Sequence, residues 1–416
     1  MEEIIMDNKK VHLWLKINKN NYFIFIFFLV CFSIILSSRY VYAFSWDPDP
    51  PILNDDPRWE KVRSLWNDHY EGKNIDELID ALIPLKDAYP AKIEPIMLLA
   101  RAHYFHARYV GKERKEHFEK SEQYALKACK MDPKNLYAIA ILLETLCYSR
   151  DRDYIFNTYG NLIKSYAPIE SAEALPDMKY PEWNDFKSLW LARIDIEKSK
   201  AAIAMVEKIA NENPKDGLAQ IWASRANYYV GEYYTCINEH DKGMPFYEKG
   251  IAYAKLARKL LPYSVPANYW YQLNRSRAVQ FTSILNKALY LMDILVPLYF
   301  CSRENSIYYF VGPALTLATM ITNGGWVVEK GMRLVNITLE MDMNALEIAE
   351  IIFPNYYYIP FARADLLAYK GKKAEALAIL EKLIIRDPYV DPLVPENYGF
   401  IQLSKRLYND IKQGKY

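Results

Sequence analysis

The clearest structural signal in this chain is the stretch Tyr357–Pro388, which reads YYIPFARADLLAYKGKKAEALAILEKLIIRDP. Two helical patterns, 357–370 and 373–386, flank Gly371, which is typical of the turn between two helices. Asp387-Pro388 ends the second pattern. Ala364 and Ala376 stand where small side chains allow two antiparallel helices to approach closely. The stretch therefore predicts one helix–turn–helix unit.

Prolines at similar spacing indicate that this unit is repeated. Pro354 and Pro388 lie 34 residues apart, Pro133 and Pro168 lie 35 apart, and Pro181 and Pro214 lie 33 apart. With the register of Gly371 and the two alanines, this period resembles the tetratricopeptide repeat (TPR). The resemblance implies an all-α, TPR-like helical-hairpin solenoid with a concave binding groove, in one or two subdomains. Recognition rather than catalysis is the function such a fold implies.

The helical patterns divide the chain into four parts. Residues 1–43 form a targeting segment, and 44–57, rich in Pro and Asp, an extended leader. Residues 58–168 contain paired helices, separated by a loop at 169–181 from a C-terminal helical domain at 182–410. The N-terminal helices are expected at 60–70, 76–88, 93–109, 115–130, 135–148 and 154–166. In the C-terminal domain, a long turn is expected between Gly231 and Gly243, because Pro214 and Pro262 lie 48 residues apart.

The first 43 residues have the pattern of a secretory signal peptide. Lys9, Lys10, Lys16 and Lys19 precede an uncharged apolar run at 23–36, and Val41-Tyr42-Ala43 resembles a cleavage site. Cleavage would start the mature chain at Phe44 and place it in the periplasm or cell envelope. If the segment is retained, it would anchor the protein in a membrane, although the run is short for a span.

Composition argues against nucleic acid as a partner. The 416 residues are 51% hydrophobic and 25% charged, with a net charge of +1, so there is no basic excess. Tyrosine is abundant, at 35 residues, and suits half-buried walls because it has an apolar body and a polar tip.

Two apolar stretches raise the question of a membrane span. The stretch 278–300 contains Asn286, Lys287, Asp293 and Pro297, which would be costly in lipid. The stretch 307–328 is uncharged, but Gly312-Pro313 and Asn323-Gly324-Gly325 are expected to limit its helix to about ten residues. Both stretches are therefore predicted to be buried central helices.

Residues suited to catalysis or metal binding are few. His103 and His106, with His117 nearby, are the only histidine cluster, and no recognised metal or nucleophile motif accompanies it. The sequence therefore predicts no enzyme, no cofactor and no metal site; an enzyme that uses the His103 region is the alternative. Cys129, Cys147, Cys236 and Cys301 lack metal-ligand spacing and are expected to be buried free thiols, with a Cys129–Cys147 disulfide left open.

A candidate groove follows from two matched tryptophans. Trp222 lies eight residues after Pro214, and Trp270 lies eight residues after Pro262. This equal spacing places both tryptophans at the same position on the first helix of successive repeats. Neighbours on the same faces complete the predicted ligand or partner groove: Arg225, Tyr228, Tyr229, Tyr269, Leu273 and Arg277. Aromatic walls with two arginines suit an organic acid or a peptide carboxylate. The alternative is that the rings pack between repeats and the arginines pair with local carboxylates.

The region from Gly217 to Asp410 also resembles the T-component proteins of TRAP transporters, which are periplasmic and TPR-like. The resemblance is carried by Tyr308–Pro313 (YYFVGP), by the Gly324-Gly325 break with the helix after it, and by the repeat from Tyr357. The stretch departs from the family pattern in two ways. A single glycine precedes Pro313 where the family has two, and the arginine that the family has soon after the proline is absent here. The resemblance implies an accessory to solute uptake that binds a periplasmic solute-binding protein.

The resemblance further implies a small organic-acid or lipophilic ligand. The alternative function is a general envelope scaffold for protein–protein interaction with no link to transport. Whether the chain forms a homo-oligomer is left open.

Overall fold

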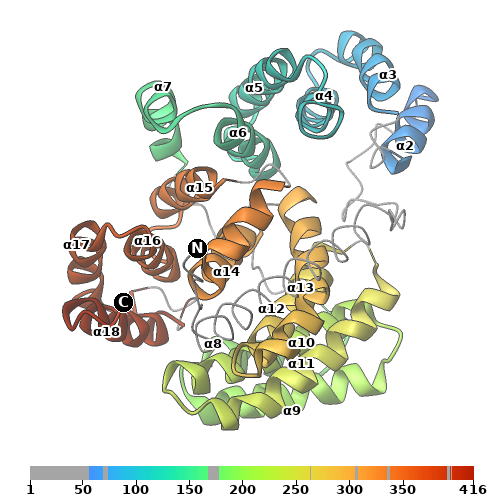
Figure 1. Ribbon diagram of the computed structural model, residues 1–416. Helices are drawn as coiled ribbons and strands as arrows, with labels where there is room; N and C mark the ends of the chain where they lie inside the picture. Colours follow the sequence, from blue (N-terminus) through green and yellow to red (C-terminus); the bar gives the residue numbers. More distant parts are fainter. Residues whose placement is uncertain are drawn as a thin grey trace, which may run out of the picture. The chain divides into compact units, whose positions relative to one another are not determined.

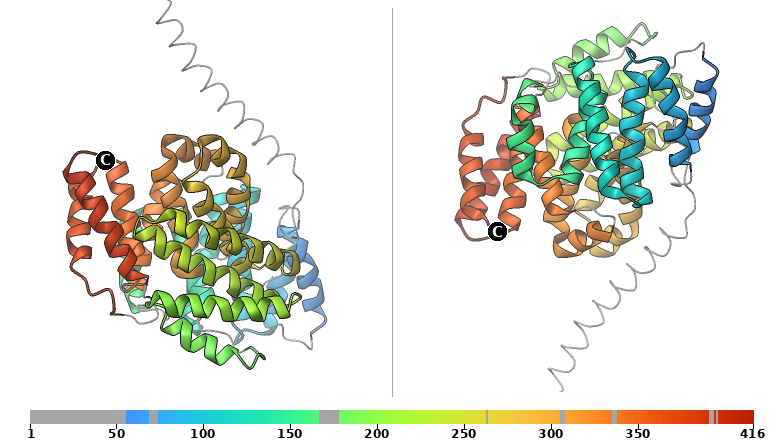
Figure 2. Two further views of the ribbon diagram at one scale, coloured as in Figure 1. Left: turned by 90° about the horizontal axis from the view of Figure 1, so that it is seen from below. Right: turned by 90° about the horizontal axis from the view of Figure 1, so that it is seen from above.

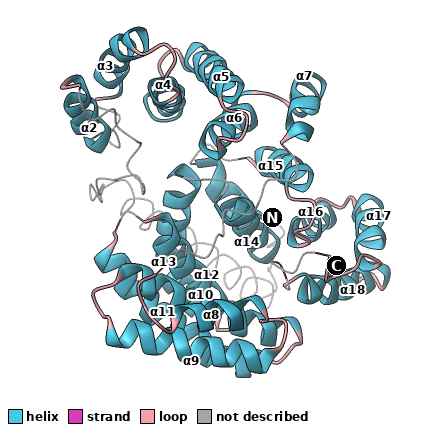
Figure 3. Ribbon diagram, turned by 180° about the vertical axis from the view of Figure 1, so that it is seen from behind, coloured by secondary structure: helices cyan, strands magenta, loops and turns pink. Residues whose placement is uncertain are grey.

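The computed structural model describes residues 56–68, 74–166, 178–262, 264–304, 308–334, 338–390, 394 and 396–416. The chain divides into two units, Met1–Ala43 and Phe44–Tyr416, and every described residue belongs to the second. The predicted signal peptide and nearly all of the predicted leader lie outside the described residues. Within the described residues there are helices and loops but no strand (Figure 3), which confirms the all-α class.

The first group of helices, blue to green in Figure 1, agrees closely with the expected pairs. It comprises α2 (Arg58–Asp68), α3 (Ile75–Ala88), α4 (Glu94–Phe105), the π-helical turn η2 (His106–Val110), α5 (Arg114–Met131), α6 (Leu136–Ser149) and α7 (Arg152–Ser165). Gly111 ends η2 at a φ of +74°, a left-handed conformation that glycine adopts without strain. The predicted turn near Gly111 is thus confirmed.

The second group contains longer helices. It comprises α8 (Trp183–Leu191), α9 (Ile196–Glu212), α10 (Gly217–Cys236), α11 (His240–Leu260), α12 (Val265–Gln280) and α13 (Ile284–Glu304). The long turn predicted between Gly231 and Gly243 is wrong, because both glycines lie inside helices and only 237–239 connect α10 to α11. A Cβ on Gly243 would lie 2.9 Å from the Gly231 carbonyl oxygen, so the glycines allow these two long helices to touch. The extra residues therefore lengthen a helical pair instead of forming a loop.

The third group, orange to red in Figure 1, completes the chain. It comprises α14 (Tyr308–Leu334), α15 (Leu339–Ile352), α16 (Tyr358–Tyr369), α17 (Lys373–Ile384) and α18 (Asn397–Lys412). The ten-residue helix expected between Pro313 and Asn323 is wrong: α14 runs 27 residues, through Pro313 and the Gly324-Gly325 pair. Pro313 is the sixth residue of α14, and Tyr309 and Val311 just before it have positive φ angles of 48° and 56°, so the backbone before the proline departs from regular helix. Gly325 has a φ of +61°, so a local irregularity does fall at the predicted break.

Helix pairing follows the order of the chain. Consecutive helices pack on each other from α2 to α6, from α8 to α13 and from α13 to α18, and next-but-one contacts join α4 to α6, α10 to α12, α14 to α16 and α16 to α18. Figure 2 shows the neighbouring helices side by side from two further directions. Contacts between each helix and its two successors are typical of stacked helical hairpins. The fold is therefore a TPR-like helical-hairpin solenoid.

Contacts between distant segments join the three groups. α15 packs on α6 and α7, α14 packs on α12, and α18 packs on α10. Two ion pairs add to these contacts. Arg152 Nε in α7 lies 2.6 Å from Glu347 Oε2 in α15, and Nη2 of Arg193, between α8 and α9, lies 3.3 Å from Oε1 of Glu396, just before α18. One hydrophobic core cluster includes residues from Ile96 in α4 to Ile401 in α18.

The repeat Tyr357–Pro388 is confirmed. α16 and α17 flank Gly371, whose φ is +79°, and Ala364 and Ala376 are both fully buried between them. The Tyr357 hydroxyl donates to the Asp387 carbonyl at 2.8 Å, which ties the start of the unit to its end.

Side-chain caps begin several helices in the way the sequence indicates. Asn135, directly before α6, accepts a hydrogen bond from the Ala138 amide at 3.0 Å. Other caps with a side-chain acceptor are Asp151, Asp195, Asp216, Ser264 and Thr338. Each satisfies backbone donors that the first helical turn leaves unpaired.

Burial differs between the two apolar helices. α14 is buried through Leu315, Ala318 and Ile321, as predicted, whereas α13 exposes large apolar side chains, so the prediction of a buried central helix there is wrong. No helix within the described parts of the chain is long and apolar enough to cross a membrane. All four cysteines from Cys129 onward are buried, and none of these described residues forms a disulfide, as expected.

Candidate functional sites

Arg225 lies at the centre of the predicted groove, surrounded by aromatic rings. Its guanidinium carbon is 4.5 Å from the ring centroid of Trp222, 5.2 Å from that of Trp270 and 5.1–5.3 Å from those of Trp190 and Tyr309. These distances are within the range of cation–π attraction. Burial lowers the pKa of Arg225 below its ordinary value, although neighbouring tyrosines oppose this. We call these five residues the Arg225 cluster.

The matched tryptophans do occupy matched positions. Trp222 follows the Asp216 cap of α10 by six residues, and Trp270 follows the Ser264 cap of α12 by six residues. α10 and α12 pack against each other, which brings the two tryptophans to the same arginine. The register argument made from the prolines is therefore confirmed at these positions.

Arg277 forms a second centre, about two turns beyond Trp270 along α12. Its Nη2 lies 2.6 Å from Glu232 Oε1, and the two side chains are only 11% and 7% exposed. The Tyr247 hydroxyl donates to Glu232 Oε2 at 3.2 Å, and Glu232 and Tyr228 help to raise the pKa of Arg277 against the opposing effect of burial. The ion pair satisfies the charge of Arg277 within the protein.

The remaining predicted groove residues lie among these contacts. Tyr228 is half-buried and packs on Trp270, with ring centroids 5.6 Å apart. Tyr229 donates to the Arg193 carbonyl at 3.1 Å, and Tyr269 packs edge-on against Trp270. Leu273 is 9% exposed. The structure thus brings all eight residues together but buries seven of them, so their role in ligand binding stays a prediction.

The histidine cluster is compact and buried. His103 Nδ1 lies 3.0 Å from His117 Nδ1, and His106 stacks on His117 with ring centroids 3.5 Å apart. His106 Nε2 also lies 3.1 Å from Asp76 Oδ1. Burial lowers the pKa of His103 to about 3 and also lowers the pKa of His117. In the parts of the chain that the structure describes, no group of three or more His, Cys, Asp or Glu residues could hold a metal ion.

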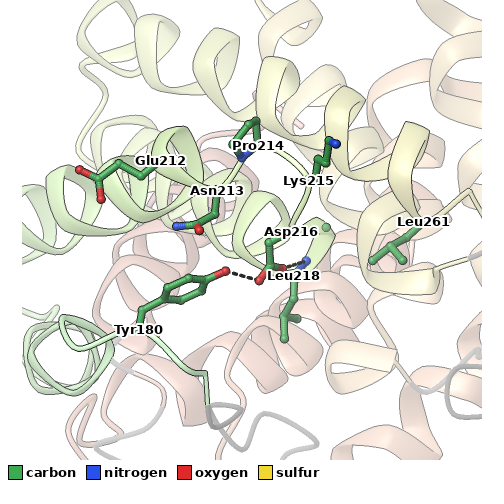
Figure 4. Close-up of a pocket in the computed structure, with 9 residues that line it drawn as sticks. Tyr180, Glu212, Asn213, Pro214, Lys215, Asp216, Leu218 and Leu261 are labelled. Carbon is green, nitrogen blue, oxygen red and sulfur yellow. Dashed lines mark hydrogen bonds between the residues drawn. The ribbon is translucent and has the colours of Figure 1, made fainter.

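A surface groove of about 820 Å³ opens beside the junction of α9 and α10 (Figure 4). Its walls are Tyr180, the segment Glu212–Leu218 and Leu261. The Tyr180 hydroxyl donates to Asp216 Oδ2 at 2.5 Å, and this bond raises the pKa of Tyr180 to about 12. Asp216 also caps α10 through the Leu218 amide at 2.8 Å. Both polar groups are therefore engaged in holding the helix junction.

A second cleft, of about 410 Å³, lies where α7, α15 and α16 meet. Three arginines and two glutamates contribute to its walls: Arg152, Arg363, Arg386, Glu347 and Glu350. Arg152 and Arg363 both contact Glu347, and Arg363 also pairs with Glu350. Most of these charged side chains are paired with one another, so their main role is to hold distant helices together.

The exposed face of α13 is the feature that sequence reasoning missed. Leu289 is 62% exposed, Val296 is 53% exposed and Tyr299 is 37% exposed. The spacing of seven and three residues places the three side chains on one face of the helix. We call this set the α13 face. The same periodicity was available in the sequence, but it does not reveal which side of an apolar helix is covered.

The fold and these sites define an all-α protein of stacked, TPR-like helical hairpins. No protein-family model and no curated protein matches the chain. Among solved structures, the chain is similar to the yeast Tom70 crystal structure, with 11% sequence identity and a TM-score of 0.20. That match covers 85% of this chain and 97% of the other. A TM-score this low does not support a fold assignment, so the fold class rests on the helix packing itself.

Proposed function

We propose that this protein is a non-catalytic TPR-like scaffold that binds another protein through the α13 face. The observation that carries the proposal is the exposure of Leu289, Val296 and Tyr299 in one row. Large apolar side chains gathered on one exposed face of a folded protein are typical of protein-binding surfaces. A row at helical spacing suits the apolar face of a partner helix, because ridges of side chains pack into grooves between them.

One exposed polar side chain beside the row is already engaged within the protein. Asp293, also on α13, accepts a hydrogen bond from the Tyr271 hydroxyl at 3.1 Å and lies 3.6 Å from Arg275 Nη2. The partner therefore gains mainly from covering apolar surface, at about 25 cal/mol per Å².

A photo-crosslinking side chain at position 296 tests this proposal. A specific partner should crosslink at Val296 and, once purified, should bind the wild-type protein but not Leu289→Asp with Val296→Asp. Ile385→Asp is the matched control, because Ile385 is 83% exposed at the end of α17 and lies outside the α13 face. Equal binding by the double variant and the control would contradict a role for the α13 face.

A second copy of the chain is the other occupant to distinguish. Sedimentation of the wild-type protein and of the double variant separates the two cases. An oligomer that the double variant dissociates would assign the α13 face to self-association instead of to a different protein.

We further propose that the partner is a periplasmic solute-binding protein of a TRAP-type transporter. Support comes from the sequence resemblance over Gly217 to Asp410, including Tyr308–Pro313 and the repeat from Tyr357. The general envelope scaffold is the alternative. Genes for a TRAP solute-binding protein beside this one, together with direct binding of that purified protein, would favour the transport role. Binding to an envelope-assembly protein instead would favour the general scaffold.

Export to the periplasm or cell envelope is part of the same proposal. It rests on the basic residues, the apolar run and Val41-Tyr42-Ala43 at the N-terminus. Mass spectrometry of protein from the cell envelope should find an N-terminus at or near Phe44. An intact N-terminus that resists carbonate extraction would instead indicate a membrane anchor.

A further inference from the structure

A cavity of about 70 Å³ lies inside the protein where α6, α13, α14 and α15 meet. Most of its walls are apolar. The residues that line it are Leu143, Glu144, Cys147, Tyr148, Ser302, Val311, Pro313, Ala314, Leu317, Met341, Asp342, Ala345, Ile348 and Ile352. Ser302, Ala314, Met341 and Ala345 are only partly buried, so the cavity lies close to the surface on that side.

Two carboxyl groups line this cavity, and their surroundings differ. Glu144 forms a buried ion pair with Arg101. Asp342, near the start of α15, is 4% exposed, and its Oδ2 is buried without a hydrogen-bond partner among the described residues. Burial alone raises the pKa of Asp342 well above its usual range. A buried polar atom without a partner is costly, and such atoms are rare in native structures unless a ligand or water completes them.

The chemistry of the walls restricts what could pair with Asp342. A metal ion needs several oxygen, nitrogen or sulfur ligands, whereas the cavity offers one free carboxyl group among apolar side chains. An anion would be repelled by the Glu144 carboxylate and by Asp342 in its ionised form. A primary ammonium ion fits, because its charge would stabilise the ionised form of Asp342, with release to solvent of the proton that burial makes this carboxyl hold. Its N–H groups would then donate charge-assisted hydrogen bonds to Asp342, and its alkyl chain would contact the apolar walls.

The volume limits the ligand to a few atoms. A cavity of about 150 Å³ holds benzene, with its six carbons, so about 70 Å³ corresponds to roughly three non-hydrogen atoms. We propose that this cavity is a binding site for a small alkylammonium ion, with Asp342 as its carboxylate partner. This inference is independent of the α13 face, since the two sites share no residue.

Alkylammonium chlorides of one to three carbons provide the test. Ligand-observed NMR should detect millimolar binding of ethylammonium, methylammonium or propylammonium to the full chain, at constant ionic strength. Propanol and propionate, of similar size but neutral or anionic, should bind at least about tenfold more weakly. No binding of any of the three ammonium ions up to about 100 mM would overturn the proposal, and so would equal binding of propanol, which would indicate a merely polar cavity.

Three variants assign the binding to the cavity. Asp342→Asn should weaken ethylammonium binding at least about tenfold, because the neutral amide loses the charge-assisted contact. Glu340→Gln removes an exposed carboxylate two residues away and should leave binding unchanged. Ala345→Met should abolish binding by filling the cavity while Asp342 is kept. Binding that survives both Asp342→Asn and Ala345→Met would place the ion elsewhere and refute the assignment.

Discussion

Gly312 shows how a single residue sets the distance between two helices. A Cβ at this position in α14 would lie 2.1 Å from the Tyr269 hydroxyl oxygen of α12 and 2.4 Å from Tyr269 Cζ. Such distances require the ring or the helix to move. Glycine is thus needed here for the close approach, and the approach in turn fixes Tyr269 beside the Arg225 cluster.

We therefore predict that Gly312→Ala destabilises the protein by roughly 1–3 kcal/mol, the usual cost of overpacking a core. Gly160→Ala is the matched control, because Gly160 is also helical and a Cβ there would meet nothing within 4 Å. That change should stabilise by up to about 1 kcal/mol, since alanine favours the helix. Urea denaturation measures both values. An equal effect at the two positions would mean that the α12–α14 contact is looser than described.

The ion pair of Arg277 and Glu232 leads to a second prediction at this scale. Arg277→Met leaves the Glu232 carboxylate buried without its cation and should cost about 3–5 kcal/mol. Glu232→Gln added to Arg277→Met should recover most of that loss, because no buried charge remains. The free energies of unfolding of the single and double variants, combined in a double-mutant cycle, measure the coupling. Additive effects would argue that Arg277 is available for an external carboxylate.

At the scale of elements, Ala376 tests the repeat register. Ala376 is fully buried in α17 at the contact with α16, whereas Ala378 on the same helix is exposed. Ala376→Trp should destabilise the protein by roughly 1–3 kcal/mol or more, while Ala378→Trp should have little effect. Thermal or urea unfolding compares them. A neutral Ala376→Trp would show that the two helices do not pack through this alanine.

The elements were largely predictable from sequence, and the exceptions have physical causes. Helix starts and turns follow local chemistry, such as the Asn135 cap and the left-handed Gly111 and Gly371. α14 was predicted too short because Pro313 and Gly324-Gly325 are weak breakers when neighbouring helices support the backbone. The burial of α13 was mispredicted because an apolar sequence cannot tell how many sides of its helix are covered.

At the scale of the whole molecule, pairings between distant segments decide which groups are buried. Arg193 forms an ion pair with Glu396, and Arg152 forms one with Glu347, each across about two hundred residues of chain. No local sequence pattern predicts such contacts. The predicted groove shows the consequence. Helical spacing correctly placed Trp222, Arg225 and Trp270 together, but α14 contributes Tyr309 to the same cluster and helps to bury it.

Burial of titratable groups also makes the stability of the whole protein depend on pH. Burial lowers the pKa of His103 from 6.5 to about 3, so between those values the unfolded chain binds a proton that the folded protein does not. Stability should therefore fall as the pH falls below about 6.5, by at most about 1.4 kcal/mol per pH unit from this residue. Asp342 contributes a pH dependence of stability with the opposite sign, because its raised pKa makes the folded protein hold a proton that the unfolded chain releases.

We predict that His103→Gln flattens the loss of stability between pH 7 and pH 5, since the variant removes the group that protonates only on unfolding. Asp342→Asn should do the reverse: it should raise stability at pH 7 by about 1–3 kcal/mol, because the amide does not have to take up a proton on folding, and it should make stability rise more steeply with pH. Urea denaturation at half-unit pH steps gives the slopes directly. Parallel curves for the wild-type protein and His103→Gln would mean that His103 can be protonated within the fold, and hence that the histidine cluster admits solvent.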